Sequence, residues 1–563
     1  MMNTKKSSLS KVLTLVGNDF KRYWVVAALE FAIFFFSSCS IILLNEEKLS
    51  PLKTTVEEIL QPNSFIAGFI SIIFPMITAI VVFGYLHKIA SVTATHSLPI
   101  SREEHFVGHF LSGYLLATLP IILNGIILAI IISAKGMPSG LAVVKLVLLM
   151  MLMSLVTYAF SVLAGMLVGT VENHVFGAIT ANLTVPAIIL VISSNFENLI
   201  KGYCSPEWSE KVMGLFLPIM RIAEANAFLI IWYIAFSLIL SIISIIAYKK
   251  RPLENATDGL IFRTTEPLIT GLYTFVMASA FGETFRSLGG YGDTDRYFIG
   301  FAIGAVLWYI TITMMCEKTV KIFNKRNIRN AVISFCIMGL LLVGAKFDIT
   351  GYAKKIPEMS DIKSVEITDL DSSGPLANMM DRIAWANEVS KVNLESQEDI
   401  ALMRGIHAQM IDTEERNADS YIFIFGIKYN LKNGTHLNRE YCIHTKKANK
   451  ISELAKLYDS KEFKEKYCYN IDKSYIKNKI KYIEFSTADE EEYKNVDLEK
   501  VDKIFNALDI DFLNRNYKEE EKLEHFATIS FETNGAWGGY YSFPIYKTDK
   551  TTIAELKKQG IIK

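Results

Sequence analysis

Two things are missing from this chain: a net charge and, in its last part, long apolar runs. The 563 residues hold 58 Lys and Arg against 58 Asp and Glu. No part has the one-sided basic character that nucleic-acid binding requires, so we expect no nucleic-acid partner. After residue 350 no apolar run reaches the roughly 20 residues that a membrane helix needs. Residues 350–563 are therefore expected to lie in water.

Motifs for catalysis and nucleotide binding are also missing. The chain has no G-x-x-x-x-G-K-[ST] loop, whose backbone amides hold phosphate, and no G-x-S-x-G nucleophile elbow. His105 and His109 stand four apart on one helix face, a spacing that two metal ligands can share. No third ligand can be named, and ordinary capping of the helix explains the same residues. We expect neither enzyme activity nor a metal or cofactor in this chain.

Cysteine is scarce, with six residues in all. Cys39, Cys316 and Cys336 lie in or beside apolar stretches, whereas Cys204, Cys442 and Cys468 lie outside them. A disulfide is chemically permitted outside the membrane. Cys442 and Cys468 either form one or remain free thiols, because spacing does not fix connectivity.

What the chain does have is nine apolar stretches in its first 350 residues. Each is bounded by charged or Gly- and Pro-containing connections, and together they predict a polytopic helical membrane protein. The segment 266–282 is the weakest, because it is short and is followed at once by Glu283, so a re-entrant or interfacial helix is the alternative there. The nine stretches are 23–44, 65–86, 106–132, 142–169, 176–193, 227–248, 266–282, 297–315 and 328–345.

Orientation follows from the basic connections, because loops rich in Lys and Arg stay in the cytoplasm. Three connections are basic, and nine spans place all three on one side. This predicts a cytoplasmic N-terminus and an extracellular region 350–563. The basic residues are Lys5, Lys6, Lys11, Lys21 and Arg22, then Lys249, Lys250, Arg251 and Arg263, and then Lys318, Lys321, Lys325, Arg326 and Arg329.

The N-terminal segment 1–22 combines apolar and polar residues at helical spacing. This pattern predicts an amphipathic elbow helix along the cytoplasmic membrane surface before the chain turns in at Trp24. A plain basic flank of the first span is the alternative. Glu30 then lies inside that span, where a carboxylate is costly and often functional. It either contributes to a translocation path or reaches the nearby interface or a basic partner.

The connection between the second and third stretches predicts a rigid cytoplasmic knob. A short polar helix ends before Leu98-Pro99, because a residue that precedes proline avoids the helical region. A new helix then begins, capped by Ser101 with Glu104 three residues on. A capped turn between two spans explains the same pattern without any partner.

Several short passages resemble type-2 ABC transporter permeases of Gram-positive bacteria. They are HSLPISR at 96–102 with FVGHFLSG at 106–113, YKKRPLENATDG at 248–259, and YNLKNG at 429–434 with REYCI at 439–443. The resemblance implies that the segment before Leu98-Pro99 couples to a separate ATP-binding subunit, which binds ATP and Mg. It implies as partners a second permease, membrane lipid and an amphiphilic substrate. The coupling residues would be Lys88, Val92, His96, Leu98, Pro99, Ser101 and Arg102.

Two G-x-x-x-G pairs allow close helix approach: Gly165 with Gly169, and Gly300 with Gly304. Packing within one chain and packing between two permeases both explain them.

The region 350–563 predicts an α+β domain made of two β-α-β-β-α repeats, 363–467 and 480–561. The first hairpin has a Lys-Asn-Gly turn at 432–434. The second has a Gly-rich loop with Trp537, Tyr540 and Tyr541. These aromatic rings either contact an extracellular ligand or fold back onto the sheet.

Together these features predict a membrane-embedded permease subunit with four parts. They are 1–22 as the elbow helix, 23–248 as a six-helix core, 249–349 as a link with three further spans, and 350–563 as the extracellular domain. By resemblance it would export or extract an amphiphile, such as an antimicrobial peptide or a lipid, across the bacterial plasma membrane. The alternative is a sensor whose extracellular domain signals to cytoplasmic partners without net transport.

Overall fold

The computed structural model divides the chain into two compact units. The membrane unit comprises Met1–Ser193, Glu207–Phe281 and Phe301–Met338, and the lobe unit comprises Ser194–Pro206, Gly282–Gly300 and Gly339–Lys563. The lobe unit thus includes the ends of several long helices as well as the region after 350. The residues described are 8–44, 56–137, 140–206, 208–288, 294–370, 382–383, 392–413, 422–468, 480–487, 494–495, 500–520, 523–533 and 540–562.

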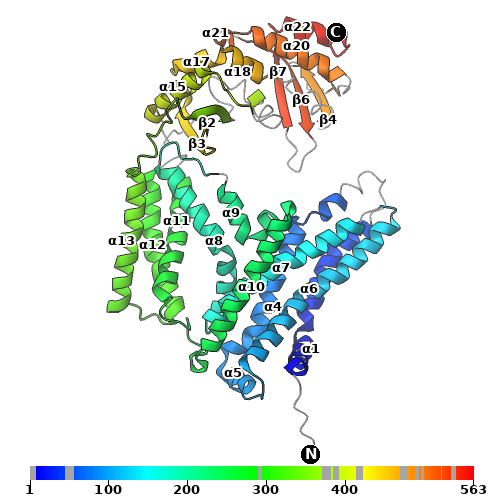
Figure 1. Cartoon of the computed structure of the whole chain (residues 1–563), viewed down its shortest axis with the longest axis vertical. Coiled ribbons are helices and arrows are strands. Elements are labelled where there is room, and N and C mark those ends of the chain that lie inside the picture. Colours follow the sequence, from blue (N-terminus) through cyan, green and yellow to red (C-terminus); the bar gives the residue numbers. More distant parts are fainter. Residues whose placement is uncertain are drawn as a thin grey trace, which may run out of the picture. The chain divides into compact units, whose positions relative to one another are not determined.

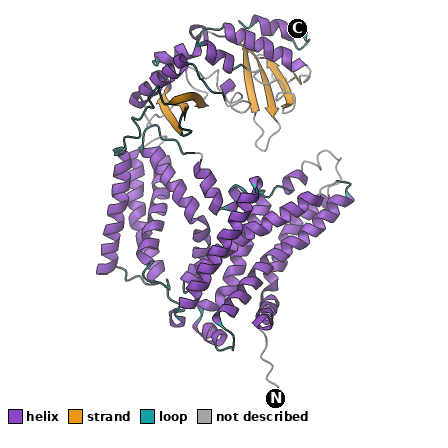
Figure 2. Cartoon of the chain, in the orientation of Figure 1, coloured by secondary structure: helices purple, strands orange, loops and turns teal. Residues whose placement is uncertain are grey.

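Within these residues, nine helices are long and apolar enough to cross a membrane, as the sequence predicts (Figures 1 and 2). The segment 266–282 belongs to a full helix of 22 residues, which is as long as the last span, Lys325–Lys346. The nine are α1 (Ser8–Phe34) continued by α2 (Ser40–Leu44), α4 (Phe65–Val82), α6 (Arg102–Ala134), α7 (Gly140–Leu167), α8 (Val171–Leu199), α10 (Ala227–Lys250), α11 (Glu266–Ser287), α12 (Thr294–Glu317) and α13 (Lys325–Lys346).

The predicted turn at Trp24 is wrong, because helix α1 runs through that residue without a break. Its polar N-terminal part packs on α6 instead of forming a separate elbow. Asp19 is 7% exposed and accepts hydrogen bonds from Ser112 Oγ at 2.5 Å and from His109 Nδ1 at 2.7 Å. These hydrogen bonds satisfy the buried carboxylate of Asp19. The polar part of α1 can therefore pack on α6 as a continuous helix. A π-helical turn at Phe35–Cys39 joins α1 to α2.

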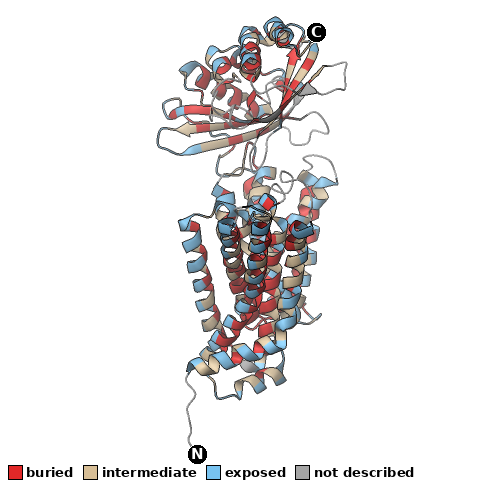
Figure 3. Cartoon of the chain, turned by 90° about the vertical axis from the view of Figure 1, so that its right-hand side faces the viewer, coloured by how far each residue is buried: buried red, intermediate tan, exposed pale blue. Residues whose placement is uncertain are grey.

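Helices α4, α6 and α7 form the interior of the membrane unit. Figure 3 shows buried residues, in red, along the helices of this unit. Wholly buried apolar residues from all three, such as Ile70, Ile121 and Val156, meet there. The remaining spans are less buried, and α13 has exposed apolar residues such as Val332 and Ile337. An apolar surface of this kind is stable only beside lipid or another apolar surface.

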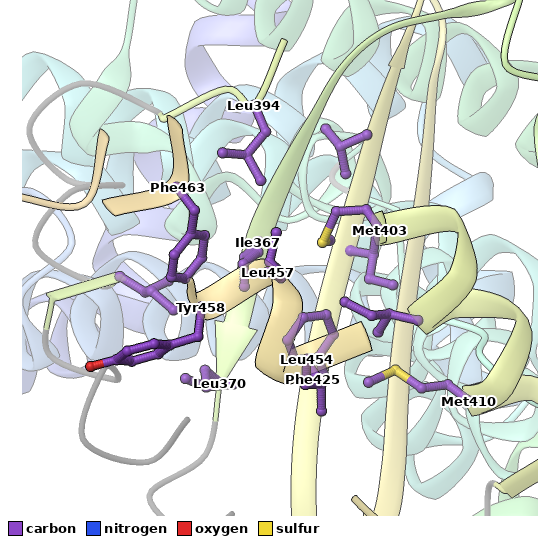
Figure 4. Packing of buried hydrophobic residues seen from close by; sticks show 14 of the residues in the cluster. Ile367, Leu370, Leu394, Met403, Met410, Phe425, Leu454, Leu457, Tyr458 and Phe463 are labelled. Atoms are coloured by element: carbon purple, nitrogen blue, oxygen red, sulfur yellow. The ribbon is translucent and has the colours of Figure 1, made fainter. Parts of the chain in front are cut away.

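The first lobe contains β1 (Ile362–Leu370), α15 (Gln397–Thr413), β2 (Ile422–Leu431), β3 (His436–His444), α16 (Thr445–Ala448), α17 (Ser452–Tyr458) and α18 (Lys461–Lys466). Its antiparallel sheet has the order β1-β2-β3. Gly434 has φ +82°, and it forms the tight turn expected between β2 and β3. Helices cover one face of this sheet around a core that includes Met403, Phe425 and Leu454 (Figure 4).

The second lobe repeats the β-α-β-β-α order and adds a short strand, β5, and a short helix, α21. It contains β4 (Ile480–Thr487), β5 (Lys494–Asn495), α20 (Val501–Asn514), α21 (Tyr517–Glu520), β6 (His525–Thr533), β7 (Tyr540–Tyr546) and α22 (Lys550–Lys558). Its antiparallel sheet has the order β5-β4-β6-β7. Strands β4, β6 and β7 therefore correspond to β1, β2 and β3. The predicted fold class is confirmed, and β5 is the short edge strand that the sequence pattern did not indicate.

All six cysteines are free thiols in the structure. Cys442 lies in β3, and the thiol of Cys468 contacts the Lys464 carbonyl with its sulfur 3.2 Å from that oxygen. Burial raises the pKa of Cys468 to about 12. The free-thiol alternative is therefore the one that the structure contains.

Candidate coupling site at the α5 end of the membrane unit

The connection between α4 and α6 forms the predicted knob. Its helix α5 spans Ile89–His96 and ends just before Leu98-Pro99. Helix α6 then begins with a reciprocal capping box: Ser101 Oγ accepts from Glu104 N, and Glu104 Oε2 accepts from Ser101 N at 2.9 Å. Both ends of the turn are thus fixed by local hydrogen bonds.

The outward surface of the knob carries apolar residues. Ile89 is 56% exposed and Leu98 is 46% exposed. Lys88, Pro99 and Ser101 are also exposed. The knob therefore presents an apolar surface beside a basic residue, as expected for a surface that another protein covers.

Three of the predicted coupling residues contact the chain itself instead. Val92 is 2% exposed, so the expectation that it would face a partner is wrong. On this short helix the side chain that anchors the knob must point inward. His96 Nε2 lies 3.3 Å from Tyr248 OH, and Arg102 donates to the Lys249 carbonyl at 2.8 Å. These residues hold the knob onto the end of α10.

A chain of aromatic side chains continues from the knob into the membrane unit. Tyr248 OH lies 2.9 Å from Tyr85 OH, and the Tyr85 ring lies 4.8 Å from the His109 ring. Burial, followed by the charge of Arg102 and then of His109, lowers the pKa of His96. His96 is therefore neutral near pH 7, which suits a hydrogen bond with a phenol.

His105 and His109, whose spacing could suit two metal ligands, differ in their hydrogen bonding. His109 binds Asp19 through Nδ1, and its ring stacks on that of His105 at 6.0 Å. Neither nitrogen of His105 has a hydrogen-bond partner among the described residues. No group of three His, Cys, Asp or Glu in the described residues is arranged to hold a metal ion.

Arg251 fixes the segment that follows α10. It is 2% exposed, and its guanidinium donates to the carbonyls of Gly165 at 2.9 Å, Met166 at 3.2 Å and Leu86 at 2.9 Å. Burial lowers the pKa of Arg251 to about 10, which still leaves it charged at neutral pH. One side chain therefore joins the short 3-10 helix Phe83–His87, which follows α4, to the ends of α7 and α10.

The segment after Arg251 then runs between the α7–α8 junction and the end of α12. Thr257 N donates to the Gly169 carbonyl at 2.8 Å, and Asn173 donates to the carbonyls of Gly259 and Met315 at 2.9 and 3.0 Å. A Cβ on Gly259 would lie 2.0 Å from the Cys316 carbonyl oxygen. The six-helix core and the further helices thus share one tightly packed link.

The G-x-x-x-G residues pack within this chain. A Cβ on Gly165 would meet the His174 ring at 2.5 Å, and one on Gly169 would meet the Asp258 backbone at 2.3 Å. Gly300 and Gly304 give α12 the same close approach to α11. The intrachain interpretation is confirmed.

Glu30 is wholly buried, and neither of its carboxylate oxygens has a hydrogen-bond partner among the described residues. It does not reach the interface or a basic partner, so that interpretation is wrong. Helix α1 buries this face against its neighbours, which keeps the side chain from extending outward. A role in a translocation path stays a prediction.

The aromatic residues of the second lobe divide between the two faces of β7. Tyr541 is 8% exposed and its ring lies 5.3 Å from Phe531 in the core, so the predicted ligand contact there is wrong. Tyr540 is 54% exposed, because successive residues of a strand face opposite sides. Trp537 lies outside the described residues.

Sequence reasoning missed three residues of the coupling site: Tyr85, Tyr248 and Arg251. The basic run 249–251 gave a signal, but it served only to predict topology and, within the passage 248–259, to support the family resemblance. Arg251 stands directly before Pro252, which ends α10 and turns this one basic side chain inward. Hydrophobicity alone does not reveal such a turn.

One family comparison bears on the chain: a domain of unknown function, DUF6449, matches residues 429–539. The match begins in β2 of the first lobe and ends after β6 of the second, so it spans parts of both lobes. No curated protein and no solved structure matches. The chain is thus a multi-span helical membrane protein with a C-terminal DUF6449 domain.

Proposed function

We propose that this chain is the permease subunit of an ATP-driven transporter, and that α5 receives the stroke of a separate ATP-binding subunit. The observation that carries the proposal is the construction of the knob. Its outer surface is apolar and exposed at Ile89 and Leu98, while Val92, His96 and Arg102 anchor it to the spans. An element that transmits a partner's movement needs an exposed surface that the partner binds and a rigid attachment to the spans.

The connections at this end support the proposed orientation. The connections after α10 and after α12 carry basic residues and lie at the same end of the membrane unit as α5 (Figure 1). Loops rich in Lys and Arg stay in the cytoplasm, so this end of the membrane unit would be the cytoplasmic end. The lobes would then be extracellular, and ATP and Mg would bind the partner subunit. A second permease completes the proposed assembly, because two ATP-binding subunits closing on each other need two knobs.

A sensor is the second candidate, and one feature of the lobe unit favours it. The loop after α8 contacts the first lobe directly: Glu440 N donates to the Gly202 carbonyl at 3.4 Å, and the Tyr203 ring lies 5.6 Å from that of Tyr352. A ligand on the lobe would therefore act on the end of a span. Transport and sensing differ in whether substrate moves.

The test uses Ile89→Asp in the full chain, purified from its native membrane. The variant should lose co-purifying ATP hydrolysis, because an unpaired charge in a protein interface costs about 2–5 kcal/mol. Val320→Asp is the matched control, since Val320 is 73% exposed in the connection after α12. Phosphate release is the measurement.

Wild-type hydrolysis in Ile89→Asp would contradict the coupling role of α5. Reconstituted vesicles then separate the two candidates. ATP-dependent movement of an amphiphile across the bilayer supports transport, whereas stimulated hydrolysis without movement supports sensing.

A further inference from the structure

Two cavities in the membrane unit meet at one wall. The first has a volume of about 340 Å³ and lies between α7, α8, α11 and α12. Its lining is almost entirely apolar and includes Leu163, Phe176, Leu272 and Ile312. This volume falls within the range of ligand pockets, about 300–1,000 Å³.

The apolar cavity contains few polar groups, and Thr184, Tyr273 and Asn173 already have hydrogen-bond partners. Thr184 Oγ1 lies 2.7 Å from Tyr273 OH, and Asn173 donates to backbone carbonyls. A polar ligand entering this space would lose water without gaining partners. A hydrocarbon chain loses nothing there, so the cavity suits the tail of an amphiphile.

The second cavity has a volume of about 440 Å³ and shares Leu260 and Cys316 with the first. It lies where α11, α12 and α13 begin or end beside the link segment. Three basic and three acidic residues line it: Arg263, Lys318 and Arg326 with Asp258, Glu266 and Glu317. A charged chamber thus directly adjoins an apolar one.

Internal pairing accounts for only part of this charge. Arg326 bonds Glu266 at 2.8 Å, whereas Arg263 and Asp258 are 3.9 Å apart and well exposed. Lys318 Nζ donates only to the Thr257 carbonyl at 3.2 Å, within the described part of the chain. Lys318 lies near the Glu172 carboxylate without forming an ion pair, and the neighbouring Glu317 forms no ion pair in the described residues, so both can still meet a ligand.

We propose that the two cavities form a single binding site for a zwitterionic glycerophospholipid. One acyl chain occupies the apolar cavity, the phosphate faces Lys318 and Arg263, and the ammonium faces Glu317 and Asp258. Chambers with basic residues between spans are suited to lipid headgroups. Lipid binding at this site is independent of the proposed function. Only the role of this lipid as the transported amphiphile rests on it.

The test measures lipid retained by the purified full chain, using native mass spectrometry. The chain is exposed to an equimolar mixture of phosphatidylethanolamine, phosphatidylglycerol and diacylglycerol in detergent. The wild type should retain one phosphatidylethanolamine per chain. Ala181→Phe, which fills the apolar cavity, and Lys318→Ala, which removes the cation, should each reduce retention about tenfold, or 1.4 kcal/mol.

Each variant has a matched control. Ile179→Phe adds the same ring on the same helix at a residue that is 46% exposed and outside the cavity lining. Lys321→Ala removes an exposed cation from the connection after α12. Neither control should change retention. If Ala181→Phe fails to insert, Gly177→Leu fills the same cavity, since a Cβ there meets Ala164 Cβ only at 3.4 Å.

Equal retention in all variants would overturn the proposal, and so would preferential retention of phosphatidylglycerol or diacylglycerol. The assay contains no ATP-binding subunit. If the wild type retains no lipid but ATPase coupling is intact, the lipid site is contradicted and the proposed function is not. Normal retention without ATPase coupling removes the transporter role and leaves the site as a structural lipid site.

Discussion

Arg251 in the membrane unit and Arg439, one of the buried arginines of the lobe unit, both donate hydrogen bonds to backbone carbonyls, but in different surroundings. Arg251 in the membrane unit is 2% exposed and Arg439 in the first lobe is 1% exposed. Neither is bound to a carboxylate in the described residues. Arg251 donates to three carbonyls at the ends of spans, and Arg439 donates to the carbonyls of Asn438 at 3.0 Å, Tyr352 at 2.9 Å and Lys355 at 3.4 Å.

The two arginines connect different segments of the chain, and we call each of these connections a joint. The joint at Arg251 binds segments that are far apart in sequence and connects to the α5 knob through Tyr248. Arg439 stacks on the Tyr352 ring at 3.8 Å and ties β3 to the segment that follows α13. Its neighbour Tyr441 bonds His407 Nε2 at 2.8 Å, and Tyr429 lies 3.0 Å from His407 Nδ1. Arg251 thus holds together the spans beside the α5 knob, and Arg439 holds the first lobe to the segment after α13.

The largest effect is expected for Arg251→Met. The substitution leaves the carbonyls of Gly165, Met166 and Leu86 buried without a donor, at a cost of about 3 kcal/mol or more. The thermal unfolding midpoint in detergent should fall, and the α5 knob should become accessible to protease. Lys250→Met is the control, because Lys250 is exposed and adjacent. Equal midpoints for the two variants would show that Arg251 is not a joint.

A smaller effect is expected for Arg439→Met, about 2 kcal/mol, because the adjacent Tyr352 ring can pack on the methionine. The measurement is resistance of the lobes to limited proteolysis in the full chain. Loss of lobe resistance should leave the α5 knob unchanged. A variant that also exposes α5 to protease would contradict the separation of the two joints.

The third prediction concerns the pH dependence of the first lobe, where His407 lies near Arg439, whereas Arg251 lies in the membrane unit. Burial, with the charges of Arg439 and Arg404, lowers the pKa of His407 from 6.5 to about 3. The unfolded chain therefore binds a proton that the folded lobe does not, and stability is full above pH 6.5. It falls as pH drops from 6.5 toward 3, by about 2 kcal/mol at pH 5 from this group.

The measurement is the midpoint of lobe proteolysis between pH 7 and pH 5, in the wild type and in His407→Gln. The variant cannot titrate, so its midpoint should depend less steeply on pH even if it starts lower. Identical slopes in the two proteins would mean that His407 does not control this dependence.

The sequence pattern predicted local elements well and their attachments poorly. Nine spans, the α5 turn with its capping box, and the repeated order of strands and helices all follow from periodicity over short stretches. The contacts of Arg251 and Tyr248 do not, because their partners lie 85 or more residues away. Asp19 illustrates the same limit: it looked like the polar face of a surface helix, yet its partner on α6 buries it.

The sequence by itself determined where helices and strands lie, since apolar spacing and turn residues act on neighbours along the chain. It also determined that the chain is a multi-pass membrane protein with a region outside the spans. Only the tertiary structure decided which side of α5 faces inward, that Glu30 and Tyr541 are buried, and that an apolar and a charged cavity share a wall. These features depend on which elements pack together, and packing joins residues whose separation in sequence carries no periodic signal.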